Sequence, residues 1–282
     1  MTEPSTDAPV RAAAAVGGDG RRIAFRWLFG GLTVSAWLVL WLWSVSPYGR
    51  LLEHGGWSED GVLGAICRSI PEGSLLVLAL LYAAGWVLMI AAMMLPTTLP
   101  IVEMFRRIVA GRADRSRLVA LLIVGYLTAW LAFGLIAHAL DALLRSFAEG
   151  FPWIAMHAWV VGAIVLGIAG VFQFSALKYR CLDKCHTPFG FITARWRGRA
   201  PAREALRLGL DHGAFCIGCC WALMLIMFVV GTGNVGWMLA LAAVMAAEKN
   251  LPGGKRLRTP LGAALIASAG VIVFVNLRSI GG

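Results

Sequence analysis

The sequence has few charged residues, and it is particularly short of acidic ones. Only 14% of its 282 residues are Asp, Glu, Lys or Arg, whereas about a quarter of the residues in a soluble domain are charged. It contains 15 acidic residues against 25 basic ones, and 59% of the chain is hydrophobic. This composition excludes an ordinary soluble domain and is too apolar for a disordered chain. It predicts an integral membrane protein.

The sequence also lacks the short motifs that mark several enzyme classes. It contains no G-x-x-x-x-G-K-[ST] phosphate-binding loop, no G-x-S-x-G nucleophile turn and no H-E-x-x-H zinc motif. We therefore assign neither an enzymatic reaction nor an ATP-driven step to this chain.

Apolar runs that could cross a bilayer recur along the chain. A transmembrane helix needs about 20 mostly apolar residues. The stretch 213–247 would form a rod of about 50 Å, too long for one crossing, and the turn-like Gly231-Thr232-Gly233-Asn234 divides it. The predicted fold class is an all-α, polytopic transmembrane helix bundle of about seven spans, near 27–46, 74–95, 118–140, 154–177, 213–231, 233–248 and 261–277.

The placement of the basic residues predicts how these spans are oriented. Lys and Arg collect in cytoplasmic loops of membrane proteins. With the N-terminus inside and the C-terminus outside, all of the basic residues fall in inner segments except Arg50, Arg68, Arg145 and Arg278. The net charge of +10 is thus a topology signal and not a sign of nucleic-acid binding. We expect a multi-pass protein of the cell inner membrane whose basic inner loops contact anionic lipid.

The chain is expected to divide into a short tail and one membrane domain. Residues 1–22 are rich in Ala and Gly with few large apolar side chains, and composition predicts a disordered cytoplasmic tail. Residues 23–282 form the single transmembrane domain. The first apolar run lacks a clear small-residue cleavage site, so we expect it to remain as an uncleaved anchor.

Five of the six cysteines lie in one 40-residue segment together with two histidines. At 100° per residue, four of these side chains share an arc of about 100° on one helix. Two further cysteines form an i, i+4 pair that also faces one way. The candidate metal ligands are Cys181, Cys185, His186, His212, Cys216, Cys219 and Cys220.

Thiolate and imidazole groups that converge from two helix ends suit a soft or borderline metal ion. Zn²⁺ takes four such ligands, and Cu(I) takes two or three thiolates or thioethers. The sequence thus predicts a Cu(I) or Zn site used in metal handling, transfer or transport, with a metal-donating protein as a partner. Two alternatives remain open: a membrane thiol–disulfide carrier that uses Cys216 and Cys219, and a structural membrane subunit whose cysteines only pack.

Other residues of the same spans are possible auxiliary ligands. Met93 and Met94 end the second span at the depth of the thiols, and Met227 continues the arc of His212. Gln173 lies two turns before Cys181 and could line the path to the site. A methionine stripe at helical spacing is more often part of an apolar core, and helix–helix hydrogen bonding explains Gln173 equally well.

Four motifs carry a family resemblance. They are Ala92-Met93-Met94-Leu95-Pro96, Gly125-Tyr126-x-x-x-Trp130, Gln173-x-x-x-Leu177-Lys178-x-x-Cys181-Leu182-x-x-Cys185-x-x-Pro188, and Gly213-x-x-Cys216-x-Gly218-Cys219-Cys220-Trp221-x-Leu223-Met224. In these residues the chain resembles a bacterial family of uncharacterised integral membrane proteins with a predicted metal-binding role. The resemblance implies a membrane location and a metal site, and it implies no particular reaction, substrate or metal.

Overall fold

The computed structural model describes the whole chain except residues 1–6, 46–74, 152, 154–156, 231–233 and 282. The described part is helical and contains no strand. Its elements are α1 (Asp7–Ser44), α3 (Leu75–Met93), η2 (Leu95–Thr98), α4 (Leu99–Ile108), α5 (Arg115–Glu149), α7 (Ala158–Phe172), α8 (Ala176–His186), α9 (Pro188–Thr193), α10 (Pro201–Val230), α11 (Val235–Asn250), η3 (Gly254–Leu257) and α12 (Arg258–Gly281).

By length and composition, four helical segments could cross a membrane. They are Ile23–Ser44, Arg115–Ala148, Pro201–Val230 and Gly254–Arg278. Two bent pairs raise the number to six if each counts as one span: Tyr82–Met93 with Leu95–Ile108, bent by 51°, and Trp159–Phe172 with Ala176–His186, bent by 62°. The described helices therefore support an all-α fold with four to six candidate spans.

The sixth of the seven predicted spans corresponds to α11. The predicted division of 213–247 is present, because α10 ends at Val230 and α11 begins at Val235. The α11 helix has 16 residues, fewer than the 20 or so that a perpendicular crossing needs.

Two bends come from identifiable residues. Pro96 and Pro100 are the second residues of η2 and α4, and proline lacks the N–H that would continue the preceding helix. At the second bend the Ser175 hydroxyl caps α8 by accepting a hydrogen bond from the Lys178 backbone N–H at 3.1 Å. The bend places Cys181 and Cys185 on a helix of their own, α8.

Two segments outside the predicted spans are helical in the structure. The α1 helix begins at Asp7, so it runs through most of the segment 1–22 that we expected to be a disordered tail; the alanines of that segment favour helix. The basic segment that follows α8 forms α9 and the first turns of α10. There the Glu204 carboxylate accepts hydrogen bonds from the backbone N–H groups of residues 197–200 and fixes the turn.

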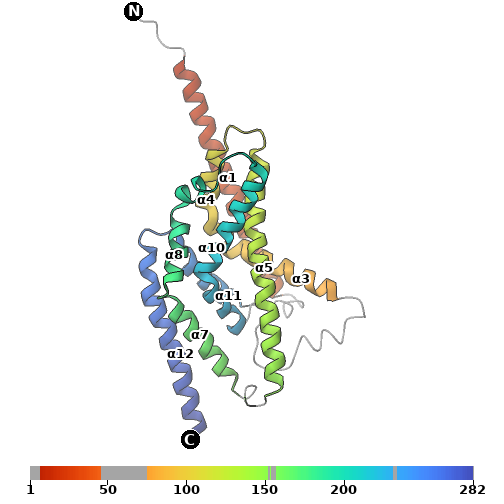
Figure 1. The fold of residues 1–282 in the computed structure, drawn as a ribbon, viewed down its shortest axis with the longest axis vertical. Helices are drawn as coiled ribbons and strands as arrows, with labels where there is room; N and C mark the ends of the chain where they lie inside the picture. Colours follow the sequence, from red (N-terminus) through yellow and green to blue (C-terminus); the bar gives the residue numbers. More distant parts are fainter. Residues whose placement is uncertain (1–6, 46–74, 152, 154–156, 231–233, 282) are drawn as a thin grey trace, which may run out of the picture.

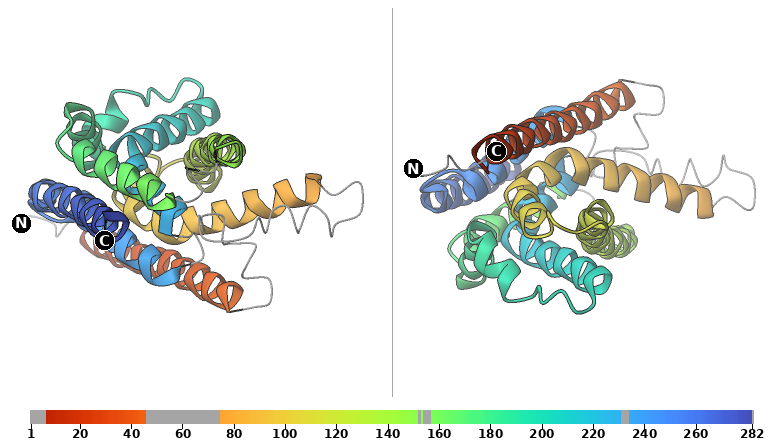
Figure 2. Two further views of the ribbon diagram at one scale, coloured as in Figure 1. Left: turned by 90° about the horizontal axis from the view of Figure 1, so that it is seen from below. Right: turned by 90° about the horizontal axis from the view of Figure 1, so that it is seen from above.

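The α5 and α10 helices pack side by side and form the centre of the bundle (Figure 1). Glycine allows their close approach: a Cβ at Gly209 would overlap the carbonyl oxygen of Leu122, and one at Gly125 would overlap that of Leu206. Small residues serve the same purpose in other membrane helix pairs. Figure 2 shows α3 extending outward from the bundle at its N-terminal end.

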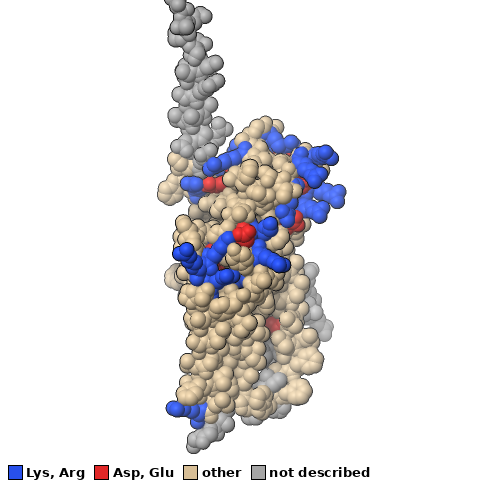
Figure 3. All heavy atoms as spheres, turned by 60° about the vertical axis from the view of Figure 1, so that its left-hand side comes forward, with Lys and Arg blue, Asp and Glu red and all other residues tan. Residues whose placement is uncertain are grey.

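The buried side chains form two separate cores. One core joins α4, the start of α5, α9 and the start of α10, and it includes Phe105, Leu118 and Leu208. The larger core contains side chains of α3, α5, α8, α10 and α11. In Figure 3 the Lys and Arg side chains gather over the upper and middle parts of one face, whereas most of the lower part of that face carries none.

Candidate metal site

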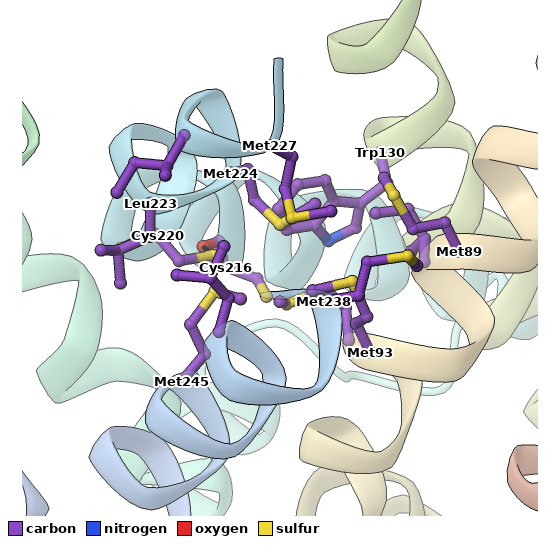
Figure 4. Close-up of a cluster of buried hydrophobic side chains, with 14 of the residues drawn as sticks. Met89, Met93, Trp130, Cys216, Cys220, Leu223, Met224, Met227, Met238 and Met245 are labelled. Atoms are coloured by element: carbon purple, nitrogen blue, oxygen red, sulfur yellow. Dashed lines mark hydrogen bonds between the residues drawn. The ribbon is translucent and has the colours of Figure 1, made fainter. Parts of the chain in front are cut away.

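The larger core is rich in sulfur. It contains seven of the ten methionines and four cysteines of the chain. We call these residues the sulfur cluster: Met89, Met93, Met94, Cys181, Cys216, Cys219, Cys220, Met224, Met227, Met238 and Met245. Figure 4 shows several of these side chains pointing into a common interior from α3, α10 and α11. Thioethers and thiolates are the preferred ligands of soft metal ions.

A lysine ammonium group lies among three of these sulfur atoms. Lys249 Nζ is 2.9 Å from Cys216 Sγ, 3.8 Å from Cys220 Sγ and 3.6 Å from Met94 Sδ. The Lys249 residue is only 5% exposed. Burying an ammonium group is costly unless polar or charged partners surround it. The sulfur atoms therefore enclose a position that already holds one positive charge.

Hydrogen bonds fix the geometry around Cys216. The Tyr126 hydroxyl lies 3.1 Å from Cys216 Sγ and 3.3 Å from the Met94 carbonyl oxygen, so it links α10 to the end of α3. The thiols of Cys219 and Cys220 both donate to the Cys216 carbonyl oxygen, at 3.1 and 2.9 Å. Tyr126, the three cysteines and Met94 are all buried.

The α8 cysteines join the cluster from the opposite side of α10. Cys181 Sγ lies over Gly218, where a Cβ would come within 2.6 Å of the sulfur. The Cys185 thiol is within hydrogen-bonding reach of Cys219. All five of these cysteines are free thiols. The structure therefore brings the five predicted cysteines together, in two groups that meet at Cys219.

The two predicted histidines lie beside the cysteines but have other neighbours. His186 Nε2 is 2.9 Å from the Glu248 carbonyl oxygen. His212 is buried, with its ring centroid 5.7 Å from those of Tyr126 and Phe191. Its Nδ1 has no hydrogen-bond partner among the described residues. Neither ring is seen in contact with Cys216, so the histidines are neighbours of the sulfur cluster.

The auxiliary residues have different locations. Met93, Met94 and Met227 belong to the sulfur cluster and are almost completely buried. Gln173 is buried at the bend between α7 and α8, against Gly262 of α12. Within the described part of the chain, neither atom of its amide has a hydrogen-bond partner.

A buried ion pair between α8 and α11 lies next to the sulfur cluster. Lys178 Nζ of α8 lies 2.7 and 3.0 Å from the two carboxylate oxygens of Glu248 on α11. The two side chains are 0% and 3% exposed. Since Glu248 precedes Lys249, this pair fixes the end of α11 that carries the ammonium group into the sulfur cluster.

The arrangement favours a set of three sulfur ligands over a four-ligand zinc site. Across the described residues, no three His, Cys, Asp or Glu side chains are placed to hold one metal ion together. A closed tetrahedral zinc site of four such ligands is therefore not preformed there. The sulfur atoms around Lys249 instead form a set of two thiols and one thioether, a number and type that suit Cu(I).

Sequence reasoning missed the central charge of this site. We assigned Lys249 to a basic inner loop, because a charge at the end of a span usually lies at the membrane surface. A signal was available: Met238, Leu241, Met245 and Lys249 recur at helical spacing along one face of α11, and all four are buried. Continuing that apolar face by one turn would have placed the lysine inside.

Comparison with known families agrees with this chemistry. A family model described as "PpoB2: Copper chaperone" matches residues 83–272. The chain belongs to the PpoB2 copper chaperone family. The matched range contains the whole sulfur cluster, the Lys178–Glu248 pair and Lys249. Searches of curated proteins and of solved structures found no match to this chain.

Proposed function

We propose that this protein is a multi-pass inner-membrane protein that binds Cu(I) as its cargo and passes the ion to a partner protein. The observation that carries the proposal is the enclosure of the Lys249 ammonium by Cys216, Cys220 and Met94. Cu(I) has the same charge as an ammonium group and prefers sulfur ligands. Membership of a copper chaperone family supports the same assignment.

Cu(I) is favoured over Zn²⁺ by the number and type of ligands. Zn²⁺ in proteins takes four ligands in tetrahedral geometry, whereas the three sulfur atoms around Lys249 match the low coordination number of Cu(I). Coordinating thiols lose their protons, so loading Cys216 and Cys220 would bring two negative charges to one Cu(I). The Lys249 ammonium would then leave the ligand position and remain near enough to balance the additional charge.

Transfer is favoured by the neighbouring thiols. Cys219 shares hydrogen-bonding contacts with Cys216, Cys220 and Cys185. An ion held by two or three sulfur atoms can exchange one ligand for the next thiol without becoming free. Cys219 and Cys185 are therefore the proposed exchange ligands between the buried site and the cytoplasmic end of α8.

We further propose seven spans, with the N-terminus inside and the C-terminus outside. The crossings would be α1, the bent pair of α3 with α4, α5, the bent pair of α7 with α8, α10, α11 and α12. The basic ends of α4, α5, α8 and α9 would then face the cytoplasm and anionic lipid. This arrangement puts Cys185 near the cytoplasmic surface, where a soluble metal donor or acceptor could reach it.

Anaerobic Cu(I) titration of the purified full-length protein tests the proposal. We expect about one tightly bound Cu(I) per chain, and a loss of at least tenfold in affinity for Cys216→Ser and Cys220→Ser. Cys67→Ser is the matched control, because Cys67 lies outside the 181–220 segment, and its affinity should equal that of the wild type.

Two results would contradict the proposal. If Cu(I) binding were equal in the wild type and in Cys216→Ser, the cysteines would be packing residues. If the protein bound no Cu(I) but formed a mixed disulfide through Cys219 when Cys216 is replaced, a thiol–disulfide carrier would be the better assignment.

A further inference from the structure

Thioethers continue beyond the cysteines along three helices. On α10, Met224 and Met227 follow Cys220 at the next two turns. On α11, Met245 and Met238 lie one turn and about three turns before Lys249. On α3, Met89 and Met93 precede Met94. All of these methionines are at most 4% exposed and belong to one continuous core.

Contacts between the helices put these residues in register. At one level the Tyr126 hydroxyl joins the Met94 carbonyl oxygen and Cys216 Sγ, and Lys249 lies beside them. At the next level Trp86 Nε1 donates to the Trp130 carbonyl oxygen at 2.9 Å, and the Trp86 ring lies 5.9 Å from that of Phe228. Met89 lies one helical turn after Trp86, and Met227 directly precedes Phe228. Both methionines therefore belong to this second level.

The two levels are separated by a definite length of helix. At about 1.5 Å of rise per residue, Met227 lies about 16 Å beyond Cys216 on α10, and Met238 lies the same distance beyond Lys249 on α11. The helices run in opposite directions, so both displacements point away from the cysteines toward the same end of the bundle. Figure 4 shows Met224, Met227, Met238, Met93 and Met89 on the Trp130 side of Cys216 and Cys220.

We call the buried methionines Met89, Met93, Met224, Met227, Met238 and Met245 the thioether column. We infer that this column is a path for Cu(I) between the cysteine site and the outer half of the membrane, so that the protein carries Cu(I) across the bilayer. The inference rests on the proposed function. A path of about 16 Å covers about half of a hydrocarbon core of about 30 Å. Neutral thioethers bind Cu(I) more weakly than thiolates do, which suits sites that the ion must leave.

Proteoliposomes with an enclosed Cu(I) indicator test the inference. The full-length protein is supplied with Cu(I) as its glutathione complex, and the initial rate of indicator response is measured. We expect the double variant Met227→Leu with Met238→Leu to lose at least tenfold in rate, since leucine keeps the volume and apolar character but removes the sulfur. Its Cu(I) stoichiometry at the cysteine site should stay at the wild-type value.

The matched control is Met104→Leu, because Met104 packs against the other core, which contains no part of the sulfur cluster. Its rate should equal that of the wild type. The inference is overturned if the double variant, folded and Cu(I)-loaded, transports as fast as the wild type. It is also overturned if the wild-type rate equals that of protein-free liposomes while Cu(I) still binds. A wild type that binds no Cu(I) overturns the proposed function, and this inference with it.

Discussion

Lys249 and Cys216 come from two different helices, α11 and α10, yet Lys249 Nζ lies 2.9 Å from Cys216 Sγ in an enclosed core. The pair shows how the site is built: α10 supplies the thiols, and α11 supplies the positive charge that they surround. Met94, from the end of α3, completes the set at 3.6 Å. A cation of the same charge can take the position of the ammonium only if the lysine side chain moves away.

Neutralising Lys249 is expected to weaken Cu(I) binding. Two deprotonated thiols around one Cu(I) leave a net charge of −1, which the nearby ammonium balances. Opposite charges about 4 Å apart attract by about 4 kcal/mol at an effective dielectric constant near 20, so we expect Lys249→Gln to bind Cu(I) at least tenfold more weakly. Competition with a chromogenic Cu(I) chelator measures the affinity. Lys255→Gln removes a charge of the same sign from a half-exposed pair with Asp183 and should change the affinity less than twofold. Unchanged or tighter binding by folded Lys249→Gln would contradict the expectation.

Replacing either Lys178 or Glu248 alone is expected to destabilise the protein. Removing one partner leaves the other buried and uncompensated, at a cost of about 3–5 kcal/mol. We expect Lys178→Met and Glu248→Leu each to lower the thermal midpoint in detergent. The double variant Lys178→Met with Glu248→Leu should recover much of that loss. A double variant that is as unstable as the sum of the single variants would show that the two residues act independently.

The contact between α5 and α10 is expected to tolerate no side chain at Gly209. A Cβ there would overlap the Leu122 carbonyl oxygen, so Gly209→Ala forces the helices apart and should destabilise the protein by about 1–3 kcal/mol. Gly167→Ala on α7 is the control, because no atom of a neighbouring element lies within 4 Å of its Cβ position. It should be neutral or stabilising by up to about 1 kcal/mol. Equal thermal midpoints for the two variants would contradict this account of the packing.

The seven-span topology is expected to put the two ends of α12 on opposite sides of the membrane. Alkaline phosphatase, which is active only outside the cytoplasm, should be inactive when fused after Gly253 and active when fused after Gly282. If α11 does not cross, both results are reversed, because six spans return the C-terminus to the cytoplasm. The measured activities of the two fusions therefore decide between six and seven crossings.

Much of the helical framework could be predicted from apolar runs, but the helix ends could not. The run 118–140 lies within α5, whose polar ends extend to Arg115 and Glu149. Hydropathy detects only the part of a helix that is apolar, whereas hydrogen bonding continues the helix through charged turns. The bend at Ser175 and the prolines after Met94 likewise depend on capping and on missing N–H groups, which hydropathy does not register.

The sequence predicted the cysteines of the candidate site but not its buried charges. Helical spacing placed His212, Cys216, Cys219 and Cys220 on one arc, and all four are buried. The enclosed charges could not be predicted in the same way. Whether Lys249 and Glu248 face water or the core depends on which helices pack against α11, and this is a tertiary relationship that composition does not contain.

The Lys249 ammonium and the residues that enclose it lie far apart along the chain, with Met94 before α5 and Lys249 in the last turn of α11. During synthesis the early segments enter the membrane long before α11 leaves the ribosome. A nascent chain therefore holds Met94, and later the cysteines, without a closed site. In the proposed function the three sulfur ligands are all synthesised before α11, so the last helices complete the enclosure of the site and its charge balance, and not its ligand set.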